Sequence, residues 1–289
     1  MTGAVPFRLG ALVIHVRQTL TEAGKPEAAL DARVLVEHFT GTSRTDAITD
    51  PQRPVPVESV EAVLAALARR IGGEPVHRII GAREFYGMRL TLSPGTLEPR
   101  PDTEALVDLV LPFVRAAADR HGICRILDLG TGTGAIALAL LSQESRAQAV
   151  GADISEDALA TAAINADMTA NTGRFQAVRS HWYSEIEGRF HIIVSNPPYI
   201  TSNDILSLER EVRDHDPLAA LDGGPDGLAA YRVIAAGAAQ YLEEGGIAAV
   251  EIGHDQSEAV AGIFAAAGFR SAGRARDLAG VVRALAFSR

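Results

Sequence analysis

The sequence RILDLGTGTGAIALALL occupies residues 125–141 and combines an apolar run, a glycine-rich turn and a second apolar run. The first run has the pattern of a buried strand, and the second has the length and composition of a helix. Glycine at positions 130, 132 and 134 lets backbone N–H groups approach a bound ligand closely. We therefore predict a strand, a ligand-binding turn and a helix, which together form the repeating unit of an α/β fold.

A second strand is predicted after this helix, in the sequence AVGAD of residues 149–153. It ends in Asp153, and an acidic side chain at this place can accept hydrogen bonds from ribose hydroxyls. The two strands together indicate a nucleoside cofactor. The glycines of the turn, with Ala135, also fit the dinucleotide pattern, so NAD is an alternative. Asp128 argues against NAD, because its carboxylate would repel a pyrophosphate but suits the cationic amino group of S-adenosylmethionine.

Another apolar run, FHIIVS at residues 190–195, is followed directly by Asn196, Pro197, Pro198 and Tyr199. Two prolines end the hydrogen bonding of a strand, so Asn196 is expected in a rigid turn at the strand's carboxyl end. Open α/β sheets bind their ligands at that end. A strand-ending turn with a packed tyrosine and no catalytic role is the alternative.

These four residues have the chemistry needed to methylate a planar NH2 group, such as a glutamine amide or the exocyclic amine of adenine. The lone pair of such a nitrogen is delocalised, so the nitrogen must be drawn toward tetrahedral geometry before it attacks a methyl group. The side-chain carbonyl of Asn196 and the main-chain carbonyl of Pro197, held in place by Pro198, can accept the two N–H groups. Tyr199 would stack on the planar group and exclude water. Because this turn has no role in hydride transfer, S-adenosylmethionine is preferred over NAD.

The carboxyl-terminal part of the chain alternates predicted strands with helical patterns. The strands are expected near residues 125–129, 148–152, 175–178, 190–195, 246–252 and 281–287. This alternation predicts a doubly wound, mostly parallel sheet. The segment 201–227 is long and rich in charged residues, and it either closes over the substrate or forms a solvated surface.

The amino-terminal part has a different pattern. Residues 7–23, 26–40 and 56–71 have the apolar spacing of amphipathic helices, which predicts a small helical bundle. Residues 74–100 are expected to form a short hairpin and a proline-stiffened loop. We therefore divide the chain into a helical domain at 1–73, a hairpin linker at 74–100 and a larger domain at 101–289.

Composition limits the class of partner. The 289 residues carry a net charge of −9, and residues 1–73 contain eight basic and eight acidic side chains, so the negative surplus lies in the remainder. This balance favours a protein substrate over a nucleic acid. No apolar run has transmembrane length and the N-terminus lacks a leader pattern, so a cytoplasmic location is expected. The single cysteine, Cys124, excludes an internal disulfide, and no cysteine or histidine cluster has metal-ligand spacing, so no metal is expected.

Together these motifs resemble the HemK/PrmC family, the N5-glutamine methyltransferases that modify class-one peptide chain release factors. The resemblance rests first on DLGTGTG at residues 128–134 and NPPY at 196–199. Further segments in the family order are EFYG at 84–87, PRPDTE at 99–104, Trp182, DGGPDGL at 222–228, EIG at 251–253 and DLAG at 277–280. NPPY is shared with adenine-N6 methyltransferases, whereas the segment 99–104 is much more specific. The resemblance covers essentially the whole chain.

The resemblance implies a class I S-adenosylmethionine-dependent methyltransferase fold, with a Rossmann-like, doubly wound, seven-stranded sheet and an N-terminal helical substrate-recognition domain. The cofactor, which becomes S-adenosylhomocysteine, would be held by Asp128, Gly130, Thr131, Gly132, Thr133, Gly134, Asp153, Trp182 and Asn196. The four residues from Asn196 to Tyr199 would hold the glutamine of the Gly-Gly-Gln tripeptide in release factors. His181 departs from the acidic residue that precedes Trp182 in many relatives; as a neutral ring it could accept from the adenine amine, or a backbone group could meet the adenine instead.

Three alternatives remain open on the sequence. A sister enzyme would methylate a glutamine of a ribosomal protein with the same site. A nucleic-acid adenine methyltransferase would use the same chemistry on a flipped base, but it would need a basic groove that the composition does not indicate. A cofactor-binding scaffold without turnover is the third. We expect release factors as partners, without stable nucleic-acid binding and without a membrane.

Overall fold

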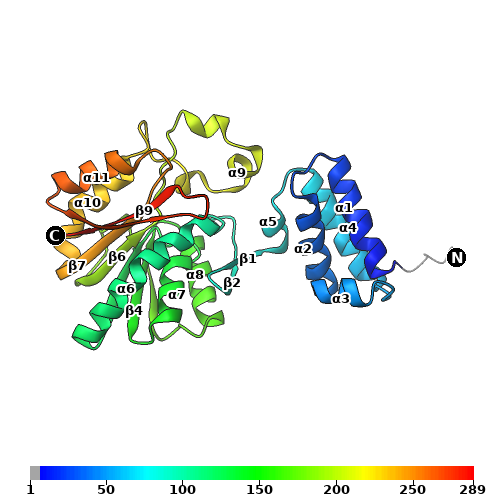
Figure 1. The fold of residues 1–289 in the computed structure, drawn as a ribbon, viewed down its shortest axis with the longest axis horizontal. Coiled ribbons are helices and arrows are strands. Elements are labelled where there is room, and N and C mark those ends of the chain that lie inside the picture. The colour runs from blue at the N-terminus through cyan, green and yellow to red at the C-terminus, as the bar shows by residue number, and fades with distance from the viewer. Residues whose placement is uncertain (1–6) are drawn as a thin grey trace. The chain divides into compact units, whose positions relative to one another are not determined.

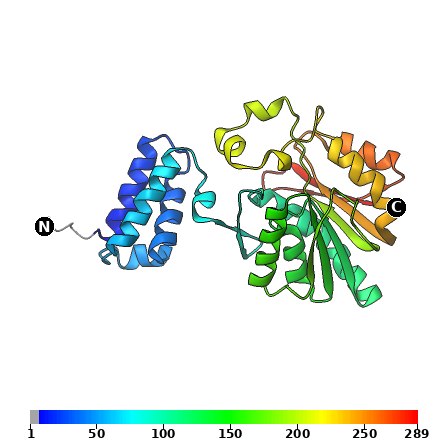
Figure 2. The same cartoon turned by 180° about the vertical axis from the view of Figure 1, so that it is seen from behind.

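The computed structural model describes residues 7–289, and the chain divides into two compact units, Met1–Gly81 and Ala82–Arg289. The first unit is helical and the second is an α/β unit (Figures 1 and 2). The helical unit extends beyond the predicted bundle to Gly81, because the short helix α5 (Val76–Ile80) packs with the bundle through its buried Val76 and Ile79. Within the described residues, no helix is long and apolar enough to cross a membrane.

Three long helices make up most of the helical unit, as predicted: α1 (Leu9–Glu22), α2 (Ala28–Thr40) and α4 (Val57–Ile71). Their apolar faces form one core whose fully buried members include Leu12, Leu35 and Val63. The short α3 (Arg44–Thr49) was not predicted from the pattern. It is set by a capping box, in which the Ser43 hydroxyl accepts from the Asp46 amide and the Asp46 carboxylate accepts from the Ser43 amide.

One buried ion pair crosses this core. Arg70 of α4 donates to Asp31 of α2 at 2.6 Å, and both side chains are about as buried as the surrounding leucines. A buried ion pair adds little stability by itself, but the loss of either partner would leave an uncompensated buried charge.

The α/β unit opens with a hairpin and is built on a seven-stranded sheet. The hairpin joins β1 (Ala82–Phe85) to β2 (Met88–Thr91). The sheet has the order β5-β4-β3-β6-β7-β9-β8. Its strands are β3 (Cys124–Leu129), β4 (Ala147–Asp153), β5 (Phe175–Arg179), β6 (Phe190–Ser195), β7 (Leu242–Glu251), β8 (Arg270–Arg276) and β9 (Val282–Ser288). The first five strands in this order, from β5 to β7, run parallel, and β9 lies antiparallel between β7 and β8. The predicted doubly wound, mostly parallel, seven-stranded sheet is therefore confirmed.

Of these strands, only β8 was absent from the sequence-predicted set. Its sequence, RSAGRAR, lacks an alternating pattern of large apolar residues, and none of its side chains is buried. It lies at the edge of the sheet, where pairing with β9 on one side is enough to hold it. Backbone pairing without apolar burial leaves no periodic signal in the sequence.

Helices cover both faces of the sheet (Figures 1 and 2). One face carries α6 (Glu104–His121), α7 (Ala135–Gln143) and α8 (Glu156–Met168), and the other carries α10 (Ala229–Tyr241) and α11 (Ser257–Ala266). Two apolar cores result, one on each face. The long connection from β6 to α10 contains η2 (Asp204–Ser207), α9 (Arg210–His215) and η3 (Leu218–Ala220).

The register of the central strands positions the functional site. Leu129 of β3 pairs with Ala152 of β4 on one side and with Ser195 of β6 on the other. The glycine-rich turn, Asp153 and Asn196 come directly after these three partners in the sequence, so they emerge on one row at the carboxyl edge. The strand order also reverses between β3 and β6, the place where open α/β sheets bind ligands.

Candidate active site

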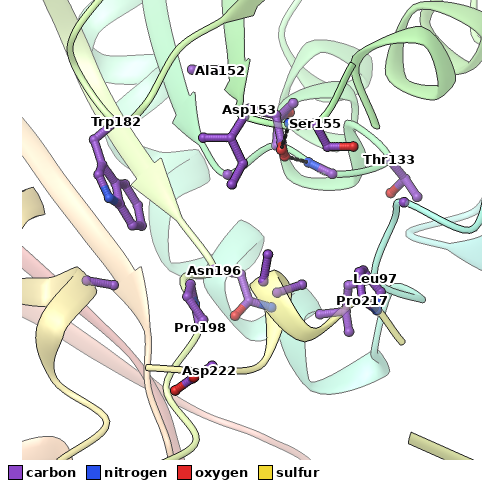
Figure 3. Close-up of a pocket in the computed structure, with 18 of the residues that line it drawn as sticks. Leu97, Thr133, Ala152, Asp153, Ser155, Trp182, Asn196, Pro198, Pro217 and Asp222 are labelled. Atoms are coloured by element: carbon purple, nitrogen blue, oxygen red, sulfur yellow. Dashed lines mark hydrogen bonds between the residues drawn. The ribbon is translucent and has the colours of Figure 1, made fainter. Parts of the chain in front are cut away.

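A cavity of about 760 Å³ lies at this edge of the sheet (Figure 3). Its volume is within the range of small-molecule and cofactor pockets. The sequence-predicted residues that line it are Gly130, Thr131, Gly132, Thr133, Asp153, Trp182, Asn196 and Pro198, joined by His181. Figure 3 shows Asp153 and Asn196 on opposite sides of the cavity. The glycine-rich turn and the NPPY turn, predicted separately, therefore border a single cavity.

The glycine-rich turn is held in a conformation that only glycine adopts easily. Gly130 and Gly132 have φ of 70° and 54°, in the left-handed region that costs a residue with a Cβ atom. The amides of Gly130 and Thr131 both donate to the Ala152 carbonyl of β4, at 2.8 and 2.9 Å. The turn is thereby pinned to the neighbouring strand with Thr131, Gly132 and Thr133 at the cavity wall.

Asp128 lies beneath the turn and does not line the cavity. It is fully buried, and its Oδ2 atom accepts from the Thr131 hydroxyl at 2.8 Å and from the Ala137 amide at 3.3 Å. Its Oδ1 atom has no hydrogen-bond partner among residues 7–289. Burial raises the pKa of Asp128 to about 7, against the hydrogen bonds from Thr131 and Ala137. The sequence placed this carboxylate against the cofactor, whereas the structure places it under the turn, where it holds the turn to α7.

Asp153 reaches the cavity with both carboxylate oxygens already anchored. Oδ2 accepts from the Gly132 amide at 2.9 Å and Oδ1 from the Ser155 amide at 3.0 Å. Each oxygen keeps a further lone pair, so the carboxylate can accept from a ligand while these bonds fix its orientation. Ser155 in turn caps α8 by accepting from the Ala158 amide. The predicted acceptor is thus aimed by the start of the next helix.

Trp182 lies at the cavity wall with a strained backbone. Its φ of 55° is unusual for a residue with a Cβ atom, and the Ser180 hydroxyl donates to its carbonyl at 2.8 Å and holds the bend. The indole is half-buried and packs on the core below the sheet. His181 also lines the cavity, but its residue is exposed to solvent.

The NPPY turn contributes two of its four residues to the cavity, Asn196 and Pro198. The Asn196 amide nitrogen Nδ2 donates to the Thr103 hydroxyl at 3.3 Å. Pro197 is buried below the wall. Tyr199 packs on the apolar core and its hydroxyl donates to Glu251 Oε1 at 3.4 Å, while burial raises the pKa of its phenol. The ring that the sequence analysis expected to stack on the substrate is thus engaged with the core in this structure.

Part of the wall comes from the connection between β6 and α10. Pro217, Ala219, Ala220, Asp222, Gly223 and Gly224 line the cavity. Gly223 donates to the Ile200 carbonyl at 2.8 Å, which ties this part of the connection to the NPPY turn. Arg100 of the PRPDTE segment also lines the cavity and pairs with Asp216 at 2.7 Å. The segment 201–227 therefore borders the ligand space.

Sequence reasoning assigned no role to several residues around the site. Thr103, Glu251 and Gln256 surround the NPPY turn through hydrogen bonds, although two of them stand in segments quoted for the resemblance, PRPDTE and EIG. Gln256 donates to the carbonyls of Tyr199 and Gly227, at 3.0 and 3.2 Å. A polar residue two or three positions from Pro101 or Gly253 was the available signal, but the sequence did not show which turn each residue would contact.

Solved structures share the fold of the α/β unit. The hMettl16 catalytic domain, solved in complex with MAT2A 3'UTR hairpin 6, has a TM-score of 0.54 at 15% identity, covering 77% of this chain and 81% of that one. A methyltransferase from Pyrococcus furiosus has a TM-score of 0.51 at 17% identity, covering 76% and 95%. At such identities the likeness concerns the fold alone. The fold is that of a class I S-adenosylmethionine-dependent methyltransferase, as the resemblance implied.

Sequence relatives are more specific. Residues 11–81 match the family described as PrmC N-terminal domain, and residues 111–211 match the family described as Methyltransferase small domain. The chain is 50% identical to the release factor glutamine methyltransferase of Agrobacterium fabrum over 289 residues, which is 100% of both chains. It is 42% identical to that of Caulobacter vibrioides over 91% of this chain and 90% of the other. The chain therefore belongs to the release factor glutamine methyltransferase family, and the resemblance to HemK/PrmC is confirmed.

The close packing of Gly223 against the NPPY turn gives a first prediction. A Cβ atom at Gly223 would lie 2.8 Å from the Tyr199 Cα and 2.9 Å from the Pro198 carbonyl oxygen. Both are backbone atoms that cannot turn away, so Gly223→Ala should destabilise the fold by about 1 to 3 kcal/mol. Denaturant unfolding measures the loss. Gly173→Ala is the matched control, because no heavy atom lies within 4 Å of its added Cβ; equal midpoints for the two variants would contradict the prediction.

Proposed function

We propose that this protein transfers a methyl group from S-adenosylmethionine to the side-chain amide nitrogen N5 of the glutamine in the Gly-Gly-Gln tripeptide of class-one peptide chain release factors. Membership of the family supports the substrate, since full-length relatives carry the name release factor glutamine methyltransferase. The observation that carries the chemistry is the meeting of Asp153 and Asn196 in one cavity. The Asp153 carboxylate can accept from ribose hydroxyls, and the Asn196 side-chain carbonyl can accept from an NH2 group.

The lining residues fit S-adenosylmethionine. Asp153 offers acceptors for the ribose hydroxyls, and the glycine-rich turn from Gly130 to Gly134 can approach the methionine part closely. Trp182 would supply an aromatic surface for the adenine, and Asp128 supports the turn from below. Bound there, the cofactor supplies an electrophilic methyl group on a cationic sulfur.

The residues of the NPPY turn would prepare the substrate nitrogen. The Asn196 side-chain carbonyl and the Pro197 main-chain carbonyl accept the two N–H groups and draw the nitrogen toward tetrahedral geometry. Pro198 limits the backbone freedom of the turn. The methylated amide nitrogen is acidic enough to lose its extra proton to water, so no strong base is needed. Positioning supplies most of the rate acceleration.

The direct test is transfer of a labelled methyl group to purified release factor, compared with a release factor whose tripeptide glutamine is changed to alanine. Label on the first and none on the second supports the proposal. Label on both would move the target away from the tripeptide, and label only on a ribosomal protein or a nucleic acid would replace the proposed substrate.

We also propose that the helical unit recognises the substrate protein. A chain shortened to residues 82–289 keeps the cavity-lining residues, all of which belong to the α/β unit. It should bind cofactor as the full chain does and methylate a short Gly-Gly-Gln peptide at a similar rate, but methylate intact release factor poorly. Steady-state rates on the two substrates make the comparison. Equal loss on peptide and protein would instead assign the helical unit a purely structural role.

Replacing Asp153 tests the cofactor site. Asp153→Ala removes one or two charge-assisted hydrogen bonds to the ribose, so S-adenosylmethionine should bind about 2 to 4 kcal/mol more weakly. Isothermal titration calorimetry measures this. Asp167→Ala is the control, because Asp167 is an exposed carboxylate of α8, the helix that follows Asp153, and does not line the cavity. An unchanged S-adenosylmethionine affinity of the Asp153→Ala variant would exclude this residue from the cofactor site. Tight binding of NAD would overturn the assignment of S-adenosylmethionine as the cofactor.

Replacing Asn196 tests the mechanism. Asn196→Ala removes an acceptor needed when the nitrogen changes geometry, so the loss should appear in turnover, roughly a hundredfold to a thousandfold, with cofactor affinity kept. Asn196→Asp should be less damaging, because a carboxylate still accepts. Asn203→Ala, an exposed asparagine of the next segment, is the control. Near wild-type turnover by folded, cofactor-bound Asn196→Ala would reduce the NPPY turn to a structural element.

A further inference from the structure

The Asn196 side-chain amide can take two orientations, in which its oxygen and its NH2 group exchange places, and the proposed chemistry does not determine which one occurs. This amide carries a carbonyl oxygen on one side and an NH2 group on the other. Only the oxygen can accept an N–H of the substrate, while an inward NH2 group would meet the substrate's own N–H groups. Something in the protein must therefore turn the oxygen toward the cavity.

Thr103 is the group that contacts this amide. It ends the short helix η1 (Pro101–Thr103), is 4% exposed, and its hydroxyl oxygen lies 3.3 Å from Asn196 Nδ2. A hydroxyl has one hydrogen and two lone pairs, so it can accept from Asn196 and donate elsewhere at the same time. The acceptor of the Thr103 hydrogen then decides which end of the amide Thr103 can hold.

Glu251 is a buried carboxylate whose pKa the Thr103 hydroxyl lowers. It is the last residue of β7 and only 2% exposed, and its Oε1 atom accepts from the Tyr199 hydroxyl. Burial raises the pKa of Glu251 to about 7, and a hydrogen bond from Thr103 is the main influence that opposes the increase. Its Oε2 atom has no hydrogen-bond partner in the described part of the chain. The carboxylate is therefore a strong, poorly satisfied acceptor next to the Thr103 hydroxyl.

We infer that Thr103 and Glu251 are positioning residues for the methyl transfer, because together they turn the carbonyl oxygen of Asn196 toward the substrate. Glu251 takes the Thr103 hydrogen, Thr103 can then only accept from Asn196, and Asn196 must present Nδ2 to Thr103 and Oδ1 to the cavity. This inference rests on the proposed function, since it concerns the orientation of the acceptor that the reaction uses.

The backbone of the NPPY turn is held by other groups. Gln256 donates to the Tyr199 carbonyl, and its own Oε1 accepts from the Gly253 amide and the Tyr231 hydroxyl, at 3.0 and 3.3 Å. These contacts do not involve Thr103. Removing the Thr103 hydroxyl should therefore release the Asn196 side chain while the turn stays in place.

The matched pair Thr103→Val and Thr103→Ser tests the first link. Valine keeps the shape and loses the hydroxyl, so turnover should fall roughly tenfold to a hundredfold, the range found when an outer partner of a functional group is lost. Serine keeps the hydroxyl and should retain most of the wild-type turnover. Cofactor affinity should be unchanged in both. The unfolding midpoint should fall only in Thr103→Val, by the loss of one buried hydrogen bond. Wild-type turnover by Thr103→Val would overturn the inference.

A double-mutant cycle separates positioning from general structure. If Thr103 acts only through Asn196, then Thr103→Val should cost nothing further when added to Asn196→Ala. Additive losses would overturn the inference and make Thr103 an independent contributor. The failure of the proposed function is distinct, because then Asn196→Ala itself would keep the wild-type rate, whatever Thr103→Val does.

The pH profile tests Glu251. The ionised Glu251 carboxylate can only accept from Thr103. The protonated acid can instead donate to Thr103, which would reverse the direction of the hydrogen bonds from Glu251 through Thr103 to Asn196. Turnover should therefore rise with pH as Glu251 ionises. Within residues 7–289, three groups besides Thr103 face the Glu251 carboxylate. The Tyr199 hydroxyl donates to it, the charge of Asp102 raises its pKa, and Arg283, which is paired with Asp102 and Asp277, lowers its pKa. The Tyr231 hydroxyl donates to the main-chain carbonyl of Glu251. Glu251→Gln should lose this rise in turnover at a similar unfolding midpoint. A Glu251→Gln variant with the wild-type pH profile would overturn the role given to Glu251.

Discussion

The shared end of three parallel strands is the constraint on which the site depends. Leu129, Ala152 and Ser195 stand on one row of the sheet, and the Ser195 hydroxyl donates to the Leu129 carbonyl at 2.7 Å and locks that row. Each strand gives way to residues that do not continue the sheet: glycines after β3, the loop beyond Asp153 at the end of β4, and prolines after β6. A one-residue shift of β6 against β3 would turn every side chain of β6 to the other face and remove Asn196 from the cavity.

Buried polar groups then hold the turns in place. Asp128 binds the glycine-rich turn from below, Glu251 and Gln256 hold the NPPY turn, and Asn165 joins the Thr91 backbone of the hairpin to the Thr133 carbonyl of the glycine-rich turn. Each is buried or half-buried, where an unmade hydrogen bond costs the full desolvation penalty. Low dielectric surroundings therefore give these contacts a specificity that exposed ones lack. The two buried carboxylates, Asp128 and Glu251, have raised pKa values because they are removed from water.

The sequence predicted the parts of this arrangement that depend on local patterns. Apolar runs ended by an acidic residue, glycine or proline located the strands at the site and placed Asp153 and Asn196 each at the end of a strand. The pairing of these strands, seen in the structure, brings the two residues to one edge. Short helices were not predicted, since α3 and α9 have six residues each, too few for a periodic pattern; α3 is set by its capping box, whereas α9 has no side-chain cap. The contacts of Thr103 with Asn196 and of Glu251 with Tyr199 were not predicted either, because each joins residues far apart in the sequence. The first joins η1 to the end of β6, and the second depends on the placement of β7 beside β6.

Substrate choice cannot lie in the two proposed acceptors, the Asn196 side-chain carbonyl and the Pro197 main-chain carbonyl. Two carbonyl acceptors set to receive an NH2 group would receive the adenine amine as readily as a glutamine amide, since both nitrogens are planar and both carry two hydrogens. Discrimination must come from surfaces around the cavity. Residues 1–73 are electrically balanced, so the net charge of −9 lies on the part of the chain that holds the cavity. A nucleic acid would approach that charge without the release of counterions that drives its binding. A protein substrate does not depend on such release. The proposed recognition of a protein by the helical unit, which has its own core and no charge surplus, agrees with this balance.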